Sequence, residues 1–289
     1  MADSFLTKFK PKLLLYESLL FLLVQSLALF AGAKLIKAGQ VELPTIEGGY
    51  FRLVQILIAF VIALVIMIIL LKLLKTPLSF GFFFSLIIFI GAQAIFEAFF
   101  PLIISIALAV AIVLIRWKFP NVVTHNLAII LGIAGISMVL GLSLRPWPEI
   151  IILLIALSIY DFIAVFKTKF MVSLFKQLLT RGAPLAIVVP ERAPALKEHI
   201  GKISAEKIRE KDKKVLMLGS GDIAFPTLFA VSAQFANGLP AAIAIIAGSI
   251  IGIIANHYLL TIKKFKFIPA LPLIAAFSIT AYLLSLGLT

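Results

Sequence analysis

Two aspartates lie inside apolar stretches of the sequence, where a charge is costly. Asp161 occurs in LSIYDFIAVFK and Asp222 in LGSGDIAFP, and each stretch belongs to an apolar run long enough to enter a bilayer. Ionisable side chains in such runs are rare and mark catalytic sites or ion pathways. This pair is therefore the first candidate for chemistry in the chain.

The positions of the two aspartates predict that they face each other. Asp161 lies six residues before Lys167, about 9 Å from the end of its helix, and Asp222 lies eight residues after Lys214, about 12 Å into the next helix. Antiparallel helices would hold both carboxyl groups at nearly the same depth. Two carboxyl groups in contact share a proton, so one can take a proton from water while the other polarises a carbonyl oxygen. This is aspartic-protease chemistry, and it needs no metal, thiol or cofactor.

Helix-loosening residues lie close to these aspartates. Gly219 and Gly221 would let another chain approach closely, although glycines can equally serve tight helix packing. Pro269 lies about 5 Å from the same side of the bilayer, and together with Pro272 it should free backbone groups at the start of the last helix. A proline-started helix is also common without any function.

The composition predicts an integral membrane protein. The chain of 289 residues is 62% hydrophobic with a mean hydropathy of +1.17, and only 13% of its residues are charged, whereas soluble domains are about 45–50% apolar. The absence of cysteine excludes disulfides, thiolate chemistry and Cys-ligated metals. The net charge of +13 is concentrated between apolar runs, which favours orientation in a bilayer over nucleic-acid binding.

The apolar runs predict an all-α polytopic membrane protein with nine transmembrane helices. We interpret Leu13–Ala33 as a retained first helix, because it is longer than the apolar core of a signal peptide. Of the 26 Lys and Arg residues, 22 fall on the N-terminal side of the predicted membrane, which predicts a cytoplasmic N-terminus and an outside C-terminus. The expected helix ranges are 13–36, 53–74, 78–97, 100–115, 123–142, 149–167, 215–236, 239–262 and 267–287.

We divide the chain into two regions. Residues 1–148 hold the N-terminal helices one to five, and residues 149–289 hold the catalytic helices six to nine with a cytoplasmic loop at 168–214. In that loop we expect an interfacial helix over Phe170–Gly182, an isolated strand within Ala183–Pro190, and a charged, mobile segment over Glu191–Lys214. An extended substrate could pair with the strand around Ile187 by β-augmentation.

Three short motifs resemble the signatures of the presenilin and signal peptide peptidase family of intramembrane aspartyl proteases. They are YDFIAVF (Tyr160–Phe166), GSGD (Gly219–Asp222) and PALP (Pro269–Pro272), in order on the sixth, seventh and ninth predicted helices. The resemblance covers the chain from about Glu149 onward. It implies a presenilin-like fold, catalytic roles for Asp161 and Asp222, and a substrate site shaped by residues of the three motifs, namely Tyr160, Gly219, Ser220, Gly221, Pro269, Ala270 and Leu271.

Two features depart from that family. Ser220 stands where members usually carry an apolar residue, which could alter substrate preference or a local hydrogen bond. The loop at 168–214 is short and has no counterpart of the autoproteolytic segment of eukaryotic presenilins, so activation by self-cleavage is not expected. The predicted orientation is similar to that of presenilins. We expect a prokaryotic, archaeal homologue that spans the cell membrane several times.

Other functions remain open at this point. A proton- or ion-coupled secondary transporter would also use buried carboxylates and broken helices. Ser220 and His257 could form a serine-protease pair, although His257 is more simply a polar residue near an interface. Glu17, five residues after Lys12, is simply interpreted as an interfacial charge. A metalloprotease is disfavoured because no H-E-x-x-H motif is present.

The expected partners follow from the protease hypothesis. They are substrates with transmembrane helices and the lipid bilayer, with no nucleic acid. No cofactor or metal is expected, and nothing in the sequence requires an accessory subunit.

Overall fold

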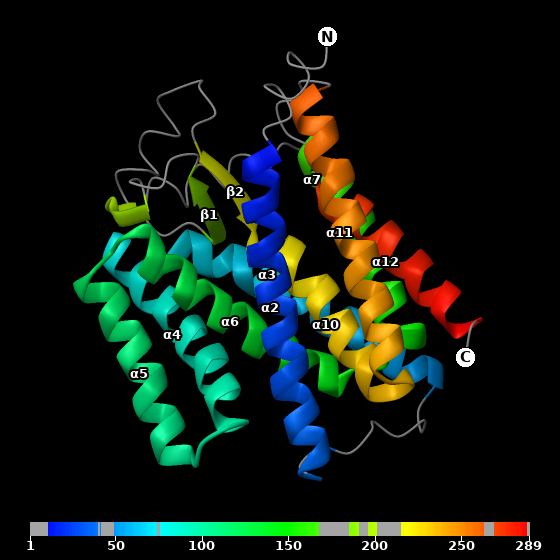
Figure 1. The fold of residues 1–289 in the computed structure, drawn as a ribbon, viewed down its shortest axis with the longest axis horizontal. Helices are drawn as coiled ribbons and strands as arrows, with labels where there is room; N and C mark the ends of the chain where they lie inside the picture. The colour runs from blue at the N-terminus through cyan, green and yellow to red at the C-terminus, as the bar shows by residue number, and fades with distance from the viewer. Residues whose placement is uncertain are drawn as a thin grey trace.

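The computed structural model describes residues 11–39, 41, 49–73, 76–167, 185–190, 196–200, 215–262 and 269–287. Within these residues the chain forms nine α-helices, one at each expected place, and a two-stranded sheet (Figure 1). The interfacial helix expected at 170–182 and most of the charged segment at 191–214 lie outside the described residues. The elements are α2 (Pro11–Lys37), α3 (Gly49–Leu73), α4 (Pro77–Glu97), α5 (Leu102–Lys118), α6 (Val122–Ser143), the π-turn η1 (Pro146–Ile150), α7 (Ile151–Phe166), β1 (Ala186–Pro190), β2 (Val215–Gly219), α10 (Ser220–Asn237), α11 (Leu239–Ile262) and α12 (Leu271–Leu286).

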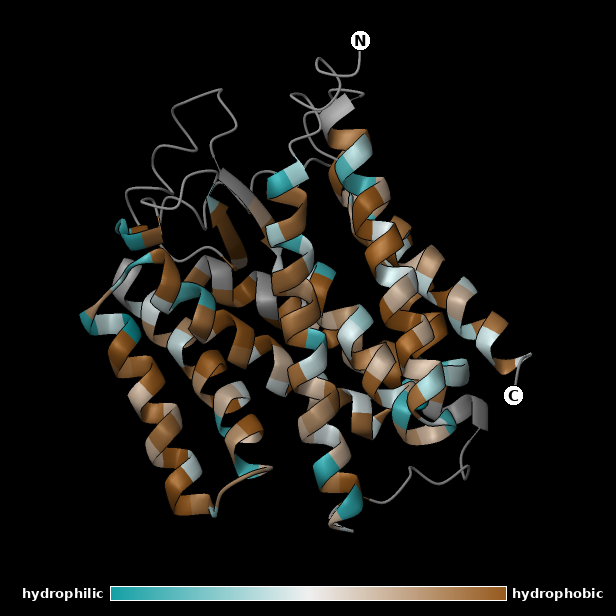
Figure 2. Cartoon of the chain, viewed as in Figure 1, coloured by the Kyte–Doolittle hydropathy of each residue, from teal (hydrophilic) through white to brown (hydrophobic). Residues whose placement is uncertain are grey.

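The surface of the helix bundle suits lipid. Figure 2 shows hydrophobic residues along the bodies of the helices and hydrophilic residues near many of their ends. Large apolar side chains such as Ile103, Phe30 and Leu284 are well exposed, and extensive exposed apolar surface is typical of contact with a membrane. Five helices of the described chain are long and apolar enough to cross a membrane: Pro11–Lys37, Ser79–Glu97, Val122–Ser143, Pro146–Phe166 and Leu239–Leu260.

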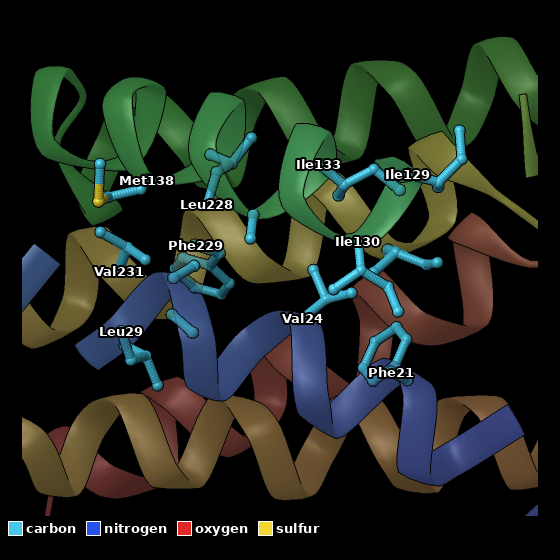
Figure 3. Packing of buried hydrophobic residues seen from close by; sticks show 14 of the residues in the cluster. Phe21, Val24, Leu29, Ile129, Ile130, Ile133, Met138, Leu228, Phe229 and Val231 are labelled. Carbon is cyan, nitrogen blue, oxygen red and sulfur yellow. The ribbon is translucent and has the colours of Figure 1, made fainter. Parts of the chain in front are cut away.

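Helix α6 forms the centre of the bundle. It packs against α2, α4 and α10, and it is the most buried of the five apolar helices. Phe21 and Val24 of α2 approach Ile130 of α6, while Phe229 of α10 lies farther along the same core, near Val231 and Leu29 (Figure 3). This core joins the N-terminal helices to the C-terminal ones.

Glycines bring the backbones of α11 and α12 into close contact. A Cβ atom on Gly252 would lie 2.6 Å from the Cα atom of Ile274, and one on Gly248 would lie 2.4 Å from the carbonyl oxygen of Phe277. Small residues at such crossings let transmembrane helices pack tightly. The contact at Gly252 therefore determines where the first turn of α12 lies.

The sequence pattern predicted an isolated strand, and this prediction is wrong, because β1 belongs to a two-stranded sheet. It pairs antiparallel with β2, with Ile187 opposite Leu218 and Val188 opposite Met217. The expectation that the seventh helix begins at residue 215 is wrong, because residues 215–219 are extended and α10 begins at Ser220. Periodicity cannot distinguish a strand from a helix in so short an apolar run. The sheet lies at the end of the molecule where α2 begins (Figure 1).

Part of the charged loop segment is anchored to the bundle. The backbone N–H of Ile200 donates to the carbonyl of Pro120 at 2.9 Å, and His199 forms a β-bridge with Asn121. Ile200 is buried in a small cluster with Val122 and Val188. This segment therefore packs on the connection between α5 and α6, next to β1.

Gly252→Ala tests the close packing of α11 and α12. The added methyl group must displace the backbone of α12, so we expect the free energy of unfolding to fall by about 1–3 kcal/mol. The measurement is denaturant or thermal unfolding in detergent. Gly81→Ala is the control, because a Cβ at Gly81 meets no atom within 4 Å. Equal stability of the two variants would contradict the close packing.

Candidate active site

Asp161 is held by the first residue of α12. Its carboxylate, near the end of α7 and partly exposed, accepts a hydrogen bond from the backbone N–H of Leu271. The first N–H groups of a helix have no partner within the helix, so they are available to an acceptor outside it. Pro272 at the second position of α12 helps to start the helix here.

Asp222 lies in the first turn of α10. Gly219, the N-cap residue, is extended, and a Cβ atom at this position would lie 2.9 Å from Oδ2 of Asp222. The carboxylate therefore lies over Gly219, and a side chain at this position would have to displace it. A helix N-terminus also favours negative charge, because the unpaired N–H groups and the helix dipole are positive there.

The two aspartates lie within electrostatic range of each other. Asp161 comes from α7, Asp222 from α10, and the N–H of Leu271 from α12. The structure therefore brings together the three motifs that the sequence analysis singled out. Two helices, α10 and α12, begin at this site, so the N-termini of both lie close to the aspartates.

The remaining motif residues surround this centre. Tyr160 is within electrostatic range of Asp161, and Pro269 and Ala270 are buried immediately before Leu271. Ser220 donates its backbone N–H to the carbonyl of Leu185 at 3.0 Å, which fixes the start of α10 to the start of β1. A Cβ at Gly221 would lie 3.6 Å from the ring of Phe225, an ordinary contact.

Helix α6 holds β1 in place through two polar residues that the sequence analysis missed. Asn126 accepts the N–H of Val188 at 2.9 Å and donates to its carbonyl at 2.7 Å. His125 Nε2 lies 3.2 Å from the carbonyl of Ala186. Both side chains are buried in α6. The signal was the pair His-Asn inside the apolar run of a central helix, where polar groups need partners.

The two edges of the sheet differ in access. In an antiparallel pair, successive residues alternate between facing the partner strand and facing away from it. Ala186 and Val188 face away from β2 and are bonded by α6, so the outer edge of β1 is occupied. Ile187 faces β2 and is fully buried. The alternation directs the backbone N–H and C=O groups of Val215 and Met217 in β2 away from β1.

Glu17 and His257, which the sequence analysis considered separately, lie together inside the bundle. Both side chains are buried, with exposed fractions of 5% and 4%. His257 Nδ1 lies 3.3 Å from Oε2 of Glu17. The two residues are 240 positions apart in the chain, so no local pattern could have paired them. Among the described residues, no group of three or more His, Asp or Glu side chains is arranged to hold a metal ion.

Comparison with known proteins identifies the family. The model of the signal-peptide peptidase and presenilin aspartyl proteases matches residues 18–288. The chain belongs to this family. It is an intramembrane aspartic protease, and therefore an integral membrane protein.

Solved structures show the same fold. One structure of a presenilin family intramembrane aspartate protease aligns with a TM-score of 0.64 at 21% identity, covering 96% of this chain and 98% of that one. A second structure with the same description, in another space group, aligns with a TM-score of 0.63 at 22% identity, covering 94% and 96% of the two chains. No match was found among curated proteins.

Gly219→Ala should displace the Asp222 carboxylate of this protease. The new methyl group occupies the space of Oδ2, and a shift of about 1 Å in a reacting group can cost about 100-fold in rate. We expect that loss in the cleavage of a transmembrane reporter peptide, with little change in the unfolding temperature. Gly221→Ala is the comparison for the folded state, since its methyl group has room. Full activity of Gly219→Ala would contradict this geometry.

Asn126→Leu should release β1 from α6. The N–H and carbonyl of Val188 would then be buried without partners, at a cost of about 1–3 kcal/mol in the free energy of unfolding. We also expect slower cleavage, because β1 supports β2. Asn121→Ala is the control: it removes the N-cap of the same helix but no bond to β1. If both variants lost activity equally, the bonds to β1 would have no special role.

Proposed function

We propose that Asp161 and Asp222 are the catalytic pair of this protease and that it hydrolyses peptide bonds within transmembrane segments of membrane proteins. The observation that carries this proposal is the convergence of α7, α10 and α12 on the two carboxyl groups, with Leu271 bonded to Asp161. Among the described residues this arrangement unites all three family motifs.

The reaction follows from two carboxyl groups that share one proton. The ionised carboxylate takes a proton from water as the water oxygen attacks the carbonyl carbon of the substrate. The protonated carboxyl group donates to the carbonyl oxygen, which gains the negative charge. The C–N bond then breaks, the amine takes a proton from the pair, and a new carboxyl end is formed. The attack is direct, with no acyl-enzyme, and uses no cofactor.

The substrate must be extended before it can be cleaved. The backbone of a transmembrane helix is fully hydrogen-bonded, so its peptide bonds are inaccessible until the helix unwinds. An added strand would pair with the open edge of β2 at Val215 and Met217, directly before the GSGD motif. This replaces the earlier hypothesis of pairing with β1 around Ile187, whose outer edge α6 occupies.

The membrane arrangement is part of the same proposal. Nine crossings with the N-terminus in the cytoplasm and the C-terminus outside would place the sheet and the dyad near the cytoplasmic side, where water enters. The division into residues 1–148 and a catalytic region 149–289 remains a prediction. So do the cell-membrane location, an effect of Ser220 on substrate preference, and activity without accessory subunits.

Replacement of each aspartate tests the dyad. In detergent, Asp161→Asn and Asp222→Asn should each lower cleavage of a transmembrane reporter peptide by about 10²–10⁴-fold or more, because each removes one proton-transfer group. Glu97→Gln is the matched control, since Glu97 is an exposed carboxylate at the end of α4. Retained cleavage in both aspartate variants would refute the proposal.

The same variants separate the protease from the main alternative. A proton- or ion-coupled transporter is supported by neither the family match nor the structural neighbours. Such a transporter would show flux in liposomes that depends on Asp161 and Asp222, without reporter cleavage. A protease would show reporter cleavage that depends on Asp161 and Asp222, without such flux in liposomes.

A further inference from the structure

The two faces of the sheet pack against different parts of the chain. Side chains alternate between the faces along each strand. On one face, Ile187 and Leu218 lie opposite each other and belong to the main core of the bundle. On the other face, Val188 and Met217 pack in a separate small cluster. Residues 196–200, which we call the cover segment, complete this cluster, so the sheet has a second support besides α6.

Ile200 attaches the cover segment. Its side chain is only 4% exposed and packs in the small cluster with Val122 of α6 and Val188 of β1. Its backbone N–H donates to the carbonyl of Pro120 at 2.9 Å. Leu196, at the other end of the segment, packs against the same cluster and is partly buried. The segment is therefore held to the start of α6 and to β1 by both backbone and side-chain contacts.

The path of contacts from Ile200 to the active site is short. Ile200 packs with Val188, and Val188 lies opposite Met217 of β2. Two residues after Met217, Gly219 ends β2 and precedes α10. A Cβ atom at Gly219 would lie 2.9 Å from Oδ2 of Asp222. A shift of the sheet therefore moves the backbone on which the Asp222 carboxylate lies.

We propose that Ile200 is a positioning residue of this protease, and that the docked cover segment holds the sheet, and with it Gly219 and Asp222, in the geometry that cleavage requires. The effect on cleavage rests on the catalytic role proposed above for Asp222. The segment stays docked during the reaction, because it covers a face of the sheet, whereas an added substrate strand needs only the edge of β2 that faces away from β1. Ile200 belongs to none of the three family motifs.

Replacement of Ile200 by serine is the first test. A hydroxyl group in this apolar cluster is unfavourable, so the segment should leave the sheet. We expect kcat for a transmembrane reporter peptide in detergent to fall by about 10- to 100-fold, because a shift of up to about 1 Å in a reacting group has an effect of this order. The unfolding temperature should change little, because Ile200 lies outside the main core. Lys197→Ser, at an exposed position of the same segment, is the matched control, and Ile200→Val should keep most of the activity. Full activity of Ile200→Ser would overturn the proposal.

A reversible disulfide gives the second test. Asn121 and His199 form an antiparallel β-bridge, and the neighbouring bond from Ile200 to Pro120 marks them as a non-hydrogen-bonded pair. The Cα atoms of such pairs are about 4.5 Å apart, within the range of a disulfide. The natural chain contains no cysteine, so Asn121→Cys with His199→Cys offers one pair of thiols.

In the Ile200→Ser background, oxidation of this pair should restore cleavage, and reduction of the same sample should remove it again. Asn121→Cys alone in that background should not respond. In the chain with Ile200 intact, oxidation should leave cleavage unchanged, which keeps the proposal testable if Ile200→Ser does not fold. Loss of cleavage on oxidation there would show that the segment must leave the sheet for catalysis, and would overturn the proposal.

Thiol reactivity separates this proposal from the proposed function. Met217 is partly buried against the small cluster, so a cysteine at this position should react slowly with a thiol reagent while the segment is docked. Met217→Cys should react faster in the Ile200→Ser background than in the Lys197→Ser background, whether or not the protein cleaves. A parent chain that never cleaves would refute the proposed function. Equal reactivity in the two backgrounds would refute the hold of Ile200 on the sheet.

Discussion

The hydrogen bond from the backbone N–H of Leu271 to the carboxylate of Asp161 is the contact on which the rest of the site depends. It requires that α12 begin at Leu271, that α7 carry its aspartate to the same depth, and that α11 hold α12 close through Gly252. A helix N-terminus is a stable source of N–H donors, because those groups have no internal partner. The position of the Asp161 carboxylate is thus determined by helix packing more than by its own helix.

The opposite side of the site depends on the sheet. Gly219 ends β2 and begins α10, so one residue connects the strand, the helix and the space for the Asp222 carboxylate. Asn126 of α6 fixes β1, and β1 in turn fixes β2. The two short strands therefore support the start of α10, where Asp222 lies. The occupied edge of β1 directs any added strand to β2, next to the aspartates.

Much of this could be predicted from the sequence. The helix ranges agree within a few residues, because charged residues interrupt the apolar runs. The depth predicted for Asp222 assumed a helix from residue 215, whereas Asp222 lies in the first turn of α10. The strand at 215–219 was missed, because a short apolar run before Gly-Ser-Gly suits either a helix or a strand. The contacts of Asn126 with Val188 and of Glu17 with His257 join distant parts of the chain. Such pairs arise from three-dimensional packing, which local patterns do not record.

The central claim is that the carboxyl groups of α7 and α10 meet, and cross-linking tests it most directly. The chain contains no cysteine, so the double variant Asp161→Cys with Asp222→Cys has no competing thiol. We predict rapid cross-linking by a short bifunctional thiol reagent in the membrane, as expected also for Glu17→Cys with His257→Cys, whose side chains are in contact. Cross-linking of the second pair without the first would show that the two aspartates lie apart, and would contradict the account.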